Sequence, residues 1–199
     1  MLSLCMDSAY KNLIIGLYDE NGLIDGIAFE AFKKQSETIF VELERLLKKN
    51  DLDYKDFDQI VITKGPGSYT GIRIAMTIAK VLSTQMGQTL KTISTMQLYA
   101  GKEEKANVIL DARSSRVYAA YLENGKLIEG PKIITLDQGE SFLKAHPAPV
   151  FGDAYLIGQQ GQSSDFLKNF GDLLLDAQRV ENKHTLTPEY LKSSEAYKA

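Results

Sequence analysis

The stretch from Leu4 to Ile24 reads LCMDSAYKNLIIGLYDENGLI, and this pattern decides the fold that we expect. A short apolar run ends at Asp7, a second apolar run covers residues 13–18, and Asn21-Gly22 follows it. Asn-Gly between two apolar runs is a strong signal of a tight β-hairpin turn. The pattern therefore predicts a strand, a turn that carries Asp7, and a hairpin whose far strand covers residues 23–32.

A second copy of this pattern begins about one hundred residues later. Residues 108–128 read VILDARSSRVYAAYLENGKLI, with Asp111 after the first run and Asn124-Gly125 after the second. The Asp-to-Gly spacing is 14 positions (125 − 111), against 15 (22 − 7) in the first copy. A matched order of turn residues indicates a duplicated lobe.

Two amphipathic segments between the copies predict helices. Residues 36–50 place apolar side chains on one face, and Ser36 is the expected N-cap. Residues 72–86 follow a compact apolar strand at 59–63, and they are apolar nearly all round except for a stripe of Arg73, Thr77 and Lys80. Such a helix must be covered on most sides, either by a neighbouring helix or by another chain.

The second half predicts strands at 107–110, 117–122, 126–135 and 150–151, with short helices at 137–145 and 165–170. Two lobes that each begin with strand, Asp turn and hairpin are typical of the actin-like, Hsp70-like and sugar-kinase group. In that group the acidic turns hold the phosphates and metal of a nucleotide. Asp7, Ser8 and Asp111 are therefore candidates for a vestigial nucleotide site, with hydrogen bonds to their own turns as the alternative.

Composition narrows the class of protein. The chain has 199 residues, of which 44% are hydrophobic and 25% are charged, an ordinary composition for a globular protein. Its net charge of −3 does not favour binding to nucleic acid without a partner protein. The single cysteine, Cys5, lies in an apolar run, so we expect it to be buried. A chain with one cysteine forms no internal disulfide, which fits a reducing compartment. No leader and no apolar run of about 20 residues is evident, so we expect a cytoplasmic protein without membrane contact.

A glycine-rich loop precedes the second helix and comprises Gly65, Pro66, Gly67, Ser68, Tyr69, Thr70 and Gly71. Its glycine spacing matches neither the Walker A nor the Rossmann phosphate loop. Its amides could still attract an anion at a helix N-terminus. The favoured alternative is a tight strand-to-helix turn in which Gly65 and Gly67 adopt special backbone angles and Thr70 caps the helix.

The string from Thr63 to Ile74, TKGPGSYTGIRI, resembles the signature of the TsaB family, also called YeaZ. Met6-Asp7-Ser8-Ala9, Asp111-Ala112-Arg113 and the closing Pro188-Glu189-Tyr190-Leu191-Lys192 resemble further family segments in the same order. This resemblance implies an α/β, two-lobed, actin-like (ASKHA, ribonuclease H-like) duplicate fold with a reduced second lobe. We expect residues 1–102 to form the first lobe and residues 103–199 the smaller second lobe.

The resemblance also implies a function. TsaB is the paralogue and partner of TsaD, which transfers a threonylcarbamoyl group to adenosine 37 of tRNA, and TsaE completes the bacterial machinery. We therefore expect a non-catalytic, activating subunit that binds TsaD, forms a homodimer when TsaD is absent, meets tRNA only through the complex, and needs no cofactor.

The expected partner surface is the first-lobe helix pair, at residues 36–50 and 72–86. Its candidate contact residues are drawn from the two helix faces: Ile39, Phe40, Leu43, Leu47, Ile72, Arg73, Met76, Thr77, Ala79 and Lys80.

Three other functions remain as alternatives. A nucleotide-binding ATPase or phosphotransferase of the actin-like group would use the acidic turns, and a peptidase would need Ser68 with a histidine base. A binding module with another client is the third. The only histidines, His146 and His184, are 38 positions apart and predict neither a metal pair nor a base, and we expect both at the surface. Gln35 stands where many family members carry a histidine.

Overall fold

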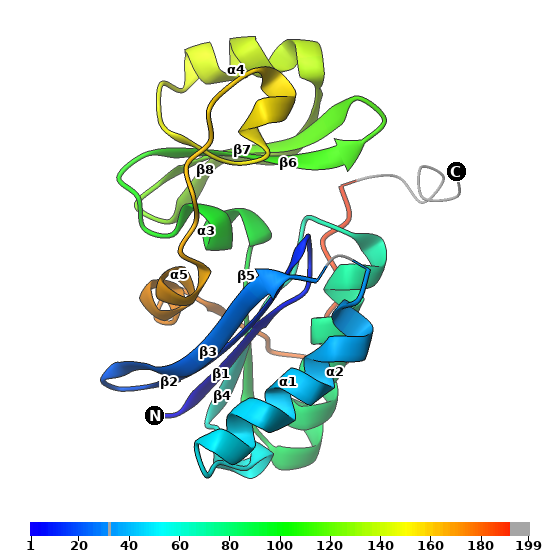
Figure 1. The fold of residues 1–199 in the computed structure, drawn as a ribbon, viewed down its shortest axis with the longest axis vertical. Helices are drawn as coiled ribbons and strands as arrows, with labels where there is room; N and C mark the ends of the chain where they lie inside the picture. Colours follow the sequence, from blue (N-terminus) through cyan, green and yellow to red (C-terminus); the bar gives the residue numbers. More distant parts are fainter. Residues whose placement is uncertain (32, 192–199) are drawn as a thin grey trace.

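The computed structural model describes residues 1–31 and 33–191, so Phe32 and the closing residues 192–199 lie outside the described part. The chain forms two lobes stacked along the long axis of the molecule, each built on one β-sheet (Figure 1). No helix of the described residues is long and apolar enough to cross a membrane.

The first sheet has the strand order β10-β5-β4-β1-β2-β3. Its first three strands, β1 (Ser3–Asp7), β2 (Asn12–Asp19) and β3 (Gly22–Glu30), form an antiparallel meander. The next two, β4 (Gln59–Thr63) and β5 (Thr89–Ile93), continue the sheet parallel to β1. A late two-residue strand, β10 (Gln178–Arg179), closes the other edge.

The second sheet repeats this topology in shorter form. Its strands are β6 (Ala106–Arg113), β7 (Arg116–Glu123), β8 (Lys126–Thr135) and β9 (Val150–Gly152), in the order β8-β7-β6-β9. In both sheets an antiparallel meander is followed by a strand parallel to the first one. The duplicated, actin-like fold and the reduced second lobe are thus confirmed.

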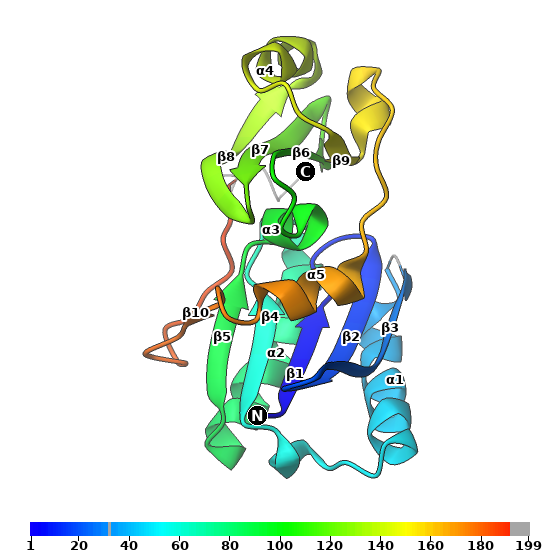
Figure 2. The same ribbon diagram turned by 90° about the vertical axis from the view of Figure 1, so that its left-hand side faces the viewer.

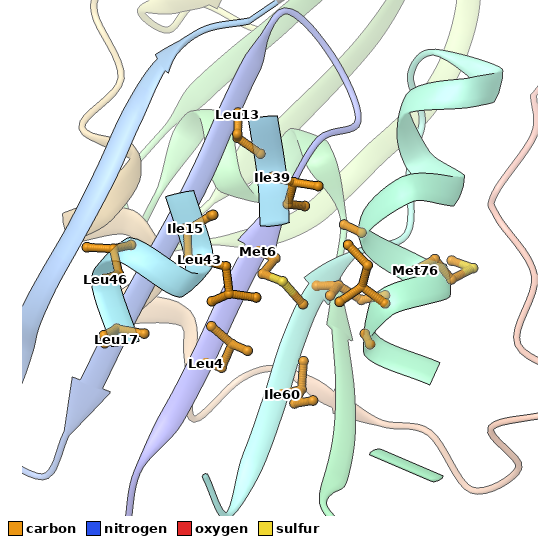
Figure 3. Close-up of a cluster of buried hydrophobic side chains, with 14 of the residues drawn as sticks. Leu4, Met6, Leu13, Ile15, Leu17, Ile39, Leu43, Leu46, Ile60 and Met76 are labelled. Carbon is orange, nitrogen blue, oxygen red and sulfur yellow. The ribbon is translucent and has the colours of Figure 1, made fainter. Parts of the chain in front are cut away.

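Helices cover both faces of the first sheet because its strands are apolar on both sides. One face carries Leu4, Met6 and Ile15, which pack under α1 (Gln35–Lys49) and α2 (Tyr69–Met86). Figure 3 shows this cluster, with Ile39 and Leu43 of α1 over the sheet. The opposite face is covered by α5 (Phe166–Leu173), which crosses the strands in Figure 2.

The short helix α3 (Thr95–Ala100) lies between the lobes (Figure 1). Its Met96 and Tyr99 pack against Leu110 and Ala120 of the second sheet. The outer face of that sheet is covered by α4 (Gly139–Ala145) through Phe142. Within the described residues, short 3₁₀ helices lie at Tyr54–Asp56, Leu136–Gln138 and Ala154–Ile157.

Several local expectations differ from the structure. Ser36 lies inside α1, and the N-cap position is Lys34, without a side-chain bond, so the Ser36 cap was wrong. Helix α2 begins at Tyr69, three residues before the expected start. Strands β5 and β10 and helix α3 were not expected at all.

The expected lobe division also differs from the observed course of the chain. The second sheet begins at Ala106, close to the expected boundary at residue 103. After the second sheet, however, the chain returns to the first lobe, where α5 packs on β2 and β3 and β10 pairs with β5. Residues 166–179 therefore belong with the first lobe.

Candidate functional site

The glycine-rich loop joins β4 to α2 and lies directly on the turn between β1 and β2. Ser68 N donates to Ala9 O at 2.7 Å, and Ser8 Oγ donates to Gly71 O at 2.7 Å. Side chains at Gly67 and Gly71 would not fit, because their Cβ atoms would lie 2.2 Å from Ala9 O and 2.3 Å from Ser8 O. The loop therefore acts as a packing joint between two turns of the first lobe.

The expected roles of individual loop residues are partly corrected. Gly65 has a special backbone angle, as predicted, with φ of +117°. Gly67 does not, and it is required for close approach instead. The helix cap is Ser68, whose Oγ accepts from Gly71 N at 3.2 Å, and Thr70 lies within the first turn of α2. Pro66 is buried, and Tyr69 and Thr70 are exposed.

Both predicted acidic turns bond to themselves. Asp7 Oδ1 accepts from Ala9 N at 3.1 Å and from the Thr63 hydroxyl, and Asp111 Oδ1 accepts from Arg113 N at 2.7 Å. Burial raises the pKa of Asp7 to about 6, against the opposing effect of the Thr63 and Ala9 hydrogen bonds. Ser8 is buried, and its hydroxyl also accepts from Ala75 N at 3.1 Å.

A third acid, Asp153, joins the two lobes at this point. It follows β9, and it accepts from the Tyr10 hydroxyl, from Lys11 Nζ at 2.6 Å and from Asp111 N at 3.0 Å. Burial, together with the Asp153 carboxylate, raises the pKa of Tyr10 far above its usual range. The β1–β2 turn is thus bonded to the second lobe through Tyr10 and Lys11. No set of three or more metal-ligand side chains gathers anywhere in the described ranges.

This interlobe contact was not predicted from the sequence. The available signal was that Asp153 follows an apolar strand, as Asp7 and Asp111 do. Gln35 also contributes here, because its buried amide donates to Tyr10 O at 2.8 Å. Gln35 therefore supports the turn between β1 and β2.

The two histidines take separate places. The side chain of His146 is only 17% exposed, which corrects its expected surface position. It stacks on Tyr121 at 4.5 Å, and its Nε2 lies 3.0 Å from Glu129. His184 is exposed, as predicted. Ser68 caps α2, and no hydrogen bond within residues 1–31 and 33–191 joins it to either histidine.

An open apolar groove of about 300 Å³ runs between α1 and α2. Phe40 (51% exposed) and Val81 (54% exposed) form its rims, and Ile39 and Ile78 are buried at its floor. We call this feature the α1/α2 groove. Its complete lining is Ser36, Ile39, Phe40, Ile74, Thr77, Ile78, Val81 and Leu82.

The ten predicted partner contacts are not all on this surface. Phe40 and Thr77 are exposed in the groove, with Ile39 beneath them. The other apolar members are buried in the chain's own core: Leu43, Leu47, Ile72, Met76 and Ala79. Four residues of α2 that line the groove were not among the predicted contacts, although their spacing of three and four positions places them on one helix face: Ile74, Ile78, Val81 and Leu82.

The remaining predicted contacts, Arg73 and Lys80, are held by the chain itself. Residues 180–191, which we call the C-terminal strap, run antiparallel along α2 (Figure 1). Lys80 Nζ donates to His184 O at 3.1 Å and to Leu186 O at 3.2 Å, and Lys183 Nζ donates to Ser83 O at 2.6 Å.

Near its end the strap reaches the start of α2, where Arg73 Nε donates to the Tyr190 hydroxyl at 2.8 Å. The sheet, α1 and the strap thus each cover part of α2. The groove side, with Phe40 and Val81 at its rims, leaves large apolar side chains of both helices open, and Val41 of α1 and Met86 of α2 are exposed outside its lining.

Comparison with known proteins gives the family. The model of the TsaD family, described as tRNA N6-adenosine threonylcarbamoyltransferase, matches residues 27–148. The chain is 27% identical to the tRNA threonylcarbamoyladenosine biosynthesis protein TsaB of Bacillus subtilis (strain 168), over 98% of this chain and 96% of that protein. The TsaB protein of Buchnera aphidicola subsp. Acyrthosiphon pisum is also 27% identical, over 61% of this chain and 58% of its own.

A solved structure supports the same fold. YeaZ from Pseudomonas aeruginosa superposes with a TM-score of 0.76 at 18% identity, over 96% of this chain and 99% of that one. The fold, the motif loop and these relatives together show that the chain belongs to the TsaB (YeaZ) branch of the TsaD family.

Proposed function

We propose that this chain is an accessory subunit that binds a TsaD chain through the α1/α2 groove. With TsaE, it would complete the machinery that forms N6-threonylcarbamoyladenosine at position 37 of tRNA. The relatives named above support a role in tRNA threonylcarbamoyladenosine biosynthesis. The observation that carries the finer proposal is the open apolar groove between α1 and α2.

The groove has the shape and chemistry of a seat for a helix. Its walls are two packed helices, and its lining is apolar apart from Ser36 and Thr77. Amphipathic helices bind such grooves through apolar side chains spaced three and four residues apart. A TsaD chain belongs to the same family as this one, so the corresponding helix pair of its own lobe is the natural occupant.

The same reasoning gives the homodimer. When TsaD is absent, a second copy of this chain presents the same two helices, and an isologous contact buries both grooves at once. We expect this contact to be weaker than the one with TsaD, since it has to give way when the partner is present.

The chain's own acids and histidines support an accessory role. Asp7, Asp111 and Asp153 bond to turns and to the other lobe, and His146 stacks in the second lobe. We propose that the chain contributes a binding surface and no catalytic groups, and that tRNA meets it only within the complex. The net charge of −3 agrees with this view.

Size-exclusion chromatography with light scattering tests the proposal. The chain is mixed with the TsaD of its own organism, and we expect a stable heterodimer. The variant Val81→Glu places a charge on the groove rim and should abolish the complex without unfolding the chain, because Val81 is 54% exposed.

The matched control is Ile128→Glu, at a position of β8 that is 57% exposed and lies in the other lobe. It should leave the heterodimer intact. A heterodimer that forms equally well with Val81→Glu would show that TsaD binds elsewhere, and no complex with the unaltered chain would remove the proposal altogether.

A further inference from the structure

Arg73 lies on α2 one turn before Thr77 of the groove, and its side chain is held in position from two sides. Its guanidinium carbon lies 3.9 Å from the centre of the Tyr69 ring. Its Nε donates to the Tyr190 hydroxyl at 2.8 Å, and the rings of Tyr69 and Tyr190 stack at 4.9 Å. Arg73 and Tyr69 are nonetheless exposed.

This arrangement orients the guanidinium group before any partner arrives. Stacking on an aromatic face and one fixed hydrogen bond remove much of the rotamer freedom of a long side chain. Tyr190 belongs to the C-terminal strap, so the strap contributes directly to the position of Arg73. The guanidinium keeps its two terminal NH₂ groups, and neither donates to an acceptor among residues 1–31 and 33–191.

The position of Arg73 relates it to the α1/α2 groove. Arg73, Thr77 and Val81 are spaced by four residues on α2, so they follow one line along the helix. Thr77 and Val81 line the groove, and Arg73 lies one turn closer to the start of the helix. Arg73 therefore stands at one end of the groove.

Covering the groove changes the surroundings of this cation. A helix that fills the groove removes water from its end, and a buried guanidinium with unpaired donors is strongly unfavourable. The cost is avoided when the partner supplies an acceptor of matching shape. A carboxylate provides two oxygens for the two parallel donors of the guanidinium.

We propose that Arg73 is the polar anchor of the docking surface, held by Tyr69 and Tyr190 to receive a carboxylate from the partner helix. This inference rests on the proposed function and specifies which partner chemistry the groove accepts. A protein carboxylate is favoured over an RNA phosphate because all eight residues that line the groove are uncharged. Phosphate backbones are normally gripped by several cations along a track.

The affinity for TsaD, measured by calorimetry at low and at high salt, tests the anchor. We expect Arg73→Met to weaken binding at least tenfold and to reduce its salt dependence. Arg73→Lys keeps the charge but loses the planar guanidinium group, so its affinity for TsaD should lie between those of Arg73→Met and the unaltered chain. Tyr190→Phe removes only the acceptor for Nε and should weaken binding a few-fold.

Lys144→Met is the matched control, since Lys144 is a well-exposed cation on α4 in the second lobe. It should bind TsaD as the unaltered chain does. Melting temperatures of all variants check that none is unfolded. In a second step, Arg73→Glu is combined with Arg substitutions of each acidic residue on the partner's helices, and one pair should restore binding.

Each outcome has a definite meaning. Equal affinities for Arg73→Met and Lys144→Met would overturn the anchor and leave the proposed function standing. An unchanged affinity for TsaD, with reduced retention of tRNA by the assembled complex, would assign Arg73 to a phosphate and would also overturn it. Failure of the unaltered chain to bind TsaD would instead remove the proposed function.

Discussion

Asp7 is the clearest case of one residue whose environment sets its behaviour. The carboxyl group is 1% exposed at the end of β1, and no cation pairs with it among the described residues. It accepts from two donors, the Thr63 hydroxyl and Ala9 N, and these hydrogen bonds favour the ionised form. Burial is the larger effect, so the neutral form is favoured in the folded chain.

This environment predicts a pH-dependent stability. The pKa of Asp7 is about 6 in the folded chain, against about 3.9 when unfolded, so the native state binds the extra proton between these values. The contribution of Asp7 to stability is therefore present below about pH 4 and is lost as the pH rises through 6. Asp7→Asn should be more stable than the unaltered chain at pH 8, by up to about 3 kcal/mol, and similar to it at pH 4.

Urea unfolding at the two pH values measures this difference. The asparagine side chain keeps the oxygen that accepts from Thr63 and Ala9, so it mimics the protonated acid. If the two chains differ in stability by the same amount at pH 4 and pH 8, ionisation of the buried Asp7 side chain does not lower the free energy of unfolding.

At the scale of elements, strong apolar patterns were predictable and weak ones were not. The runs at residues 13–18 and 72–86 predicted β2 and α2 because burial on one or both faces demands such patterns. Strand β5 was missed because Thr89–Ile93 has only two apolar residues, Leu90 and Ile93, in five positions. Helix α3 has six residues, too few to show a helical period.

The candidate site was predictable only in outline for the same reason. An apolar helix face indicates burial, but it does not say whether the cover is the chain's own sheet or a partner. Leu43 and Met76 were therefore assigned to the partner surface although they lie in the core. The C-terminal strap has no periodic pattern, and lysine contacts to backbone carbonyls contribute to holding it.

The strap gives a prediction at this scale. Lys183 Nζ donates to Ser83 O at 2.6 Å and to Gln88 O at 2.7 Å, next to the end of α2 at Met86. Lys183→Met keeps the aliphatic stem and removes both bonds, so it should lower the free energy of unfolding by about 1–3 kcal/mol. Chemical denaturation measures this loss.

Lys168→Met is the control, because Lys168 forms an exposed pair with Asp172 on α5. Such pairs contribute roughly 0–1 kcal/mol. A loss for Lys183→Met no larger than for this control would mean that packing alone holds the strap.

At the scale of the whole molecule, the two lobes are fixed to each other through Asp153. Its carboxylate accepts from Tyr10 and Lys11 of the first lobe and from Asp111 N of the second. Helix α3 packs against the second sheet beside this contact. The two lobes are thus bonded to each other by side chains of the chain itself.

Asp153→Asn should loosen this contact. The amide keeps one oxygen for Tyr10 and Asp111 N and presents an NH₂ group to Lys11 Nζ, so the charged bond between Lys11 and residue 153 is lost. We expect stability to fall by about 1–3 kcal/mol and the distance distribution between spin labels on β3 and β8 to broaden. Asp176→Asn, which breaks an exposed pair with Lys102, should change neither.

The most direct test of the central claim is hydrogen–deuterium exchange of this chain with and without the TsaD of its own organism. When TsaD is bound, we expect slower exchange of the backbone amides over residues 35–49 and 69–86, the helices that form the α1/α2 groove. Exchange in β6 to β9 should change little. Protection confined to the second lobe, or to the interlobe contact around Asp153, would contradict it.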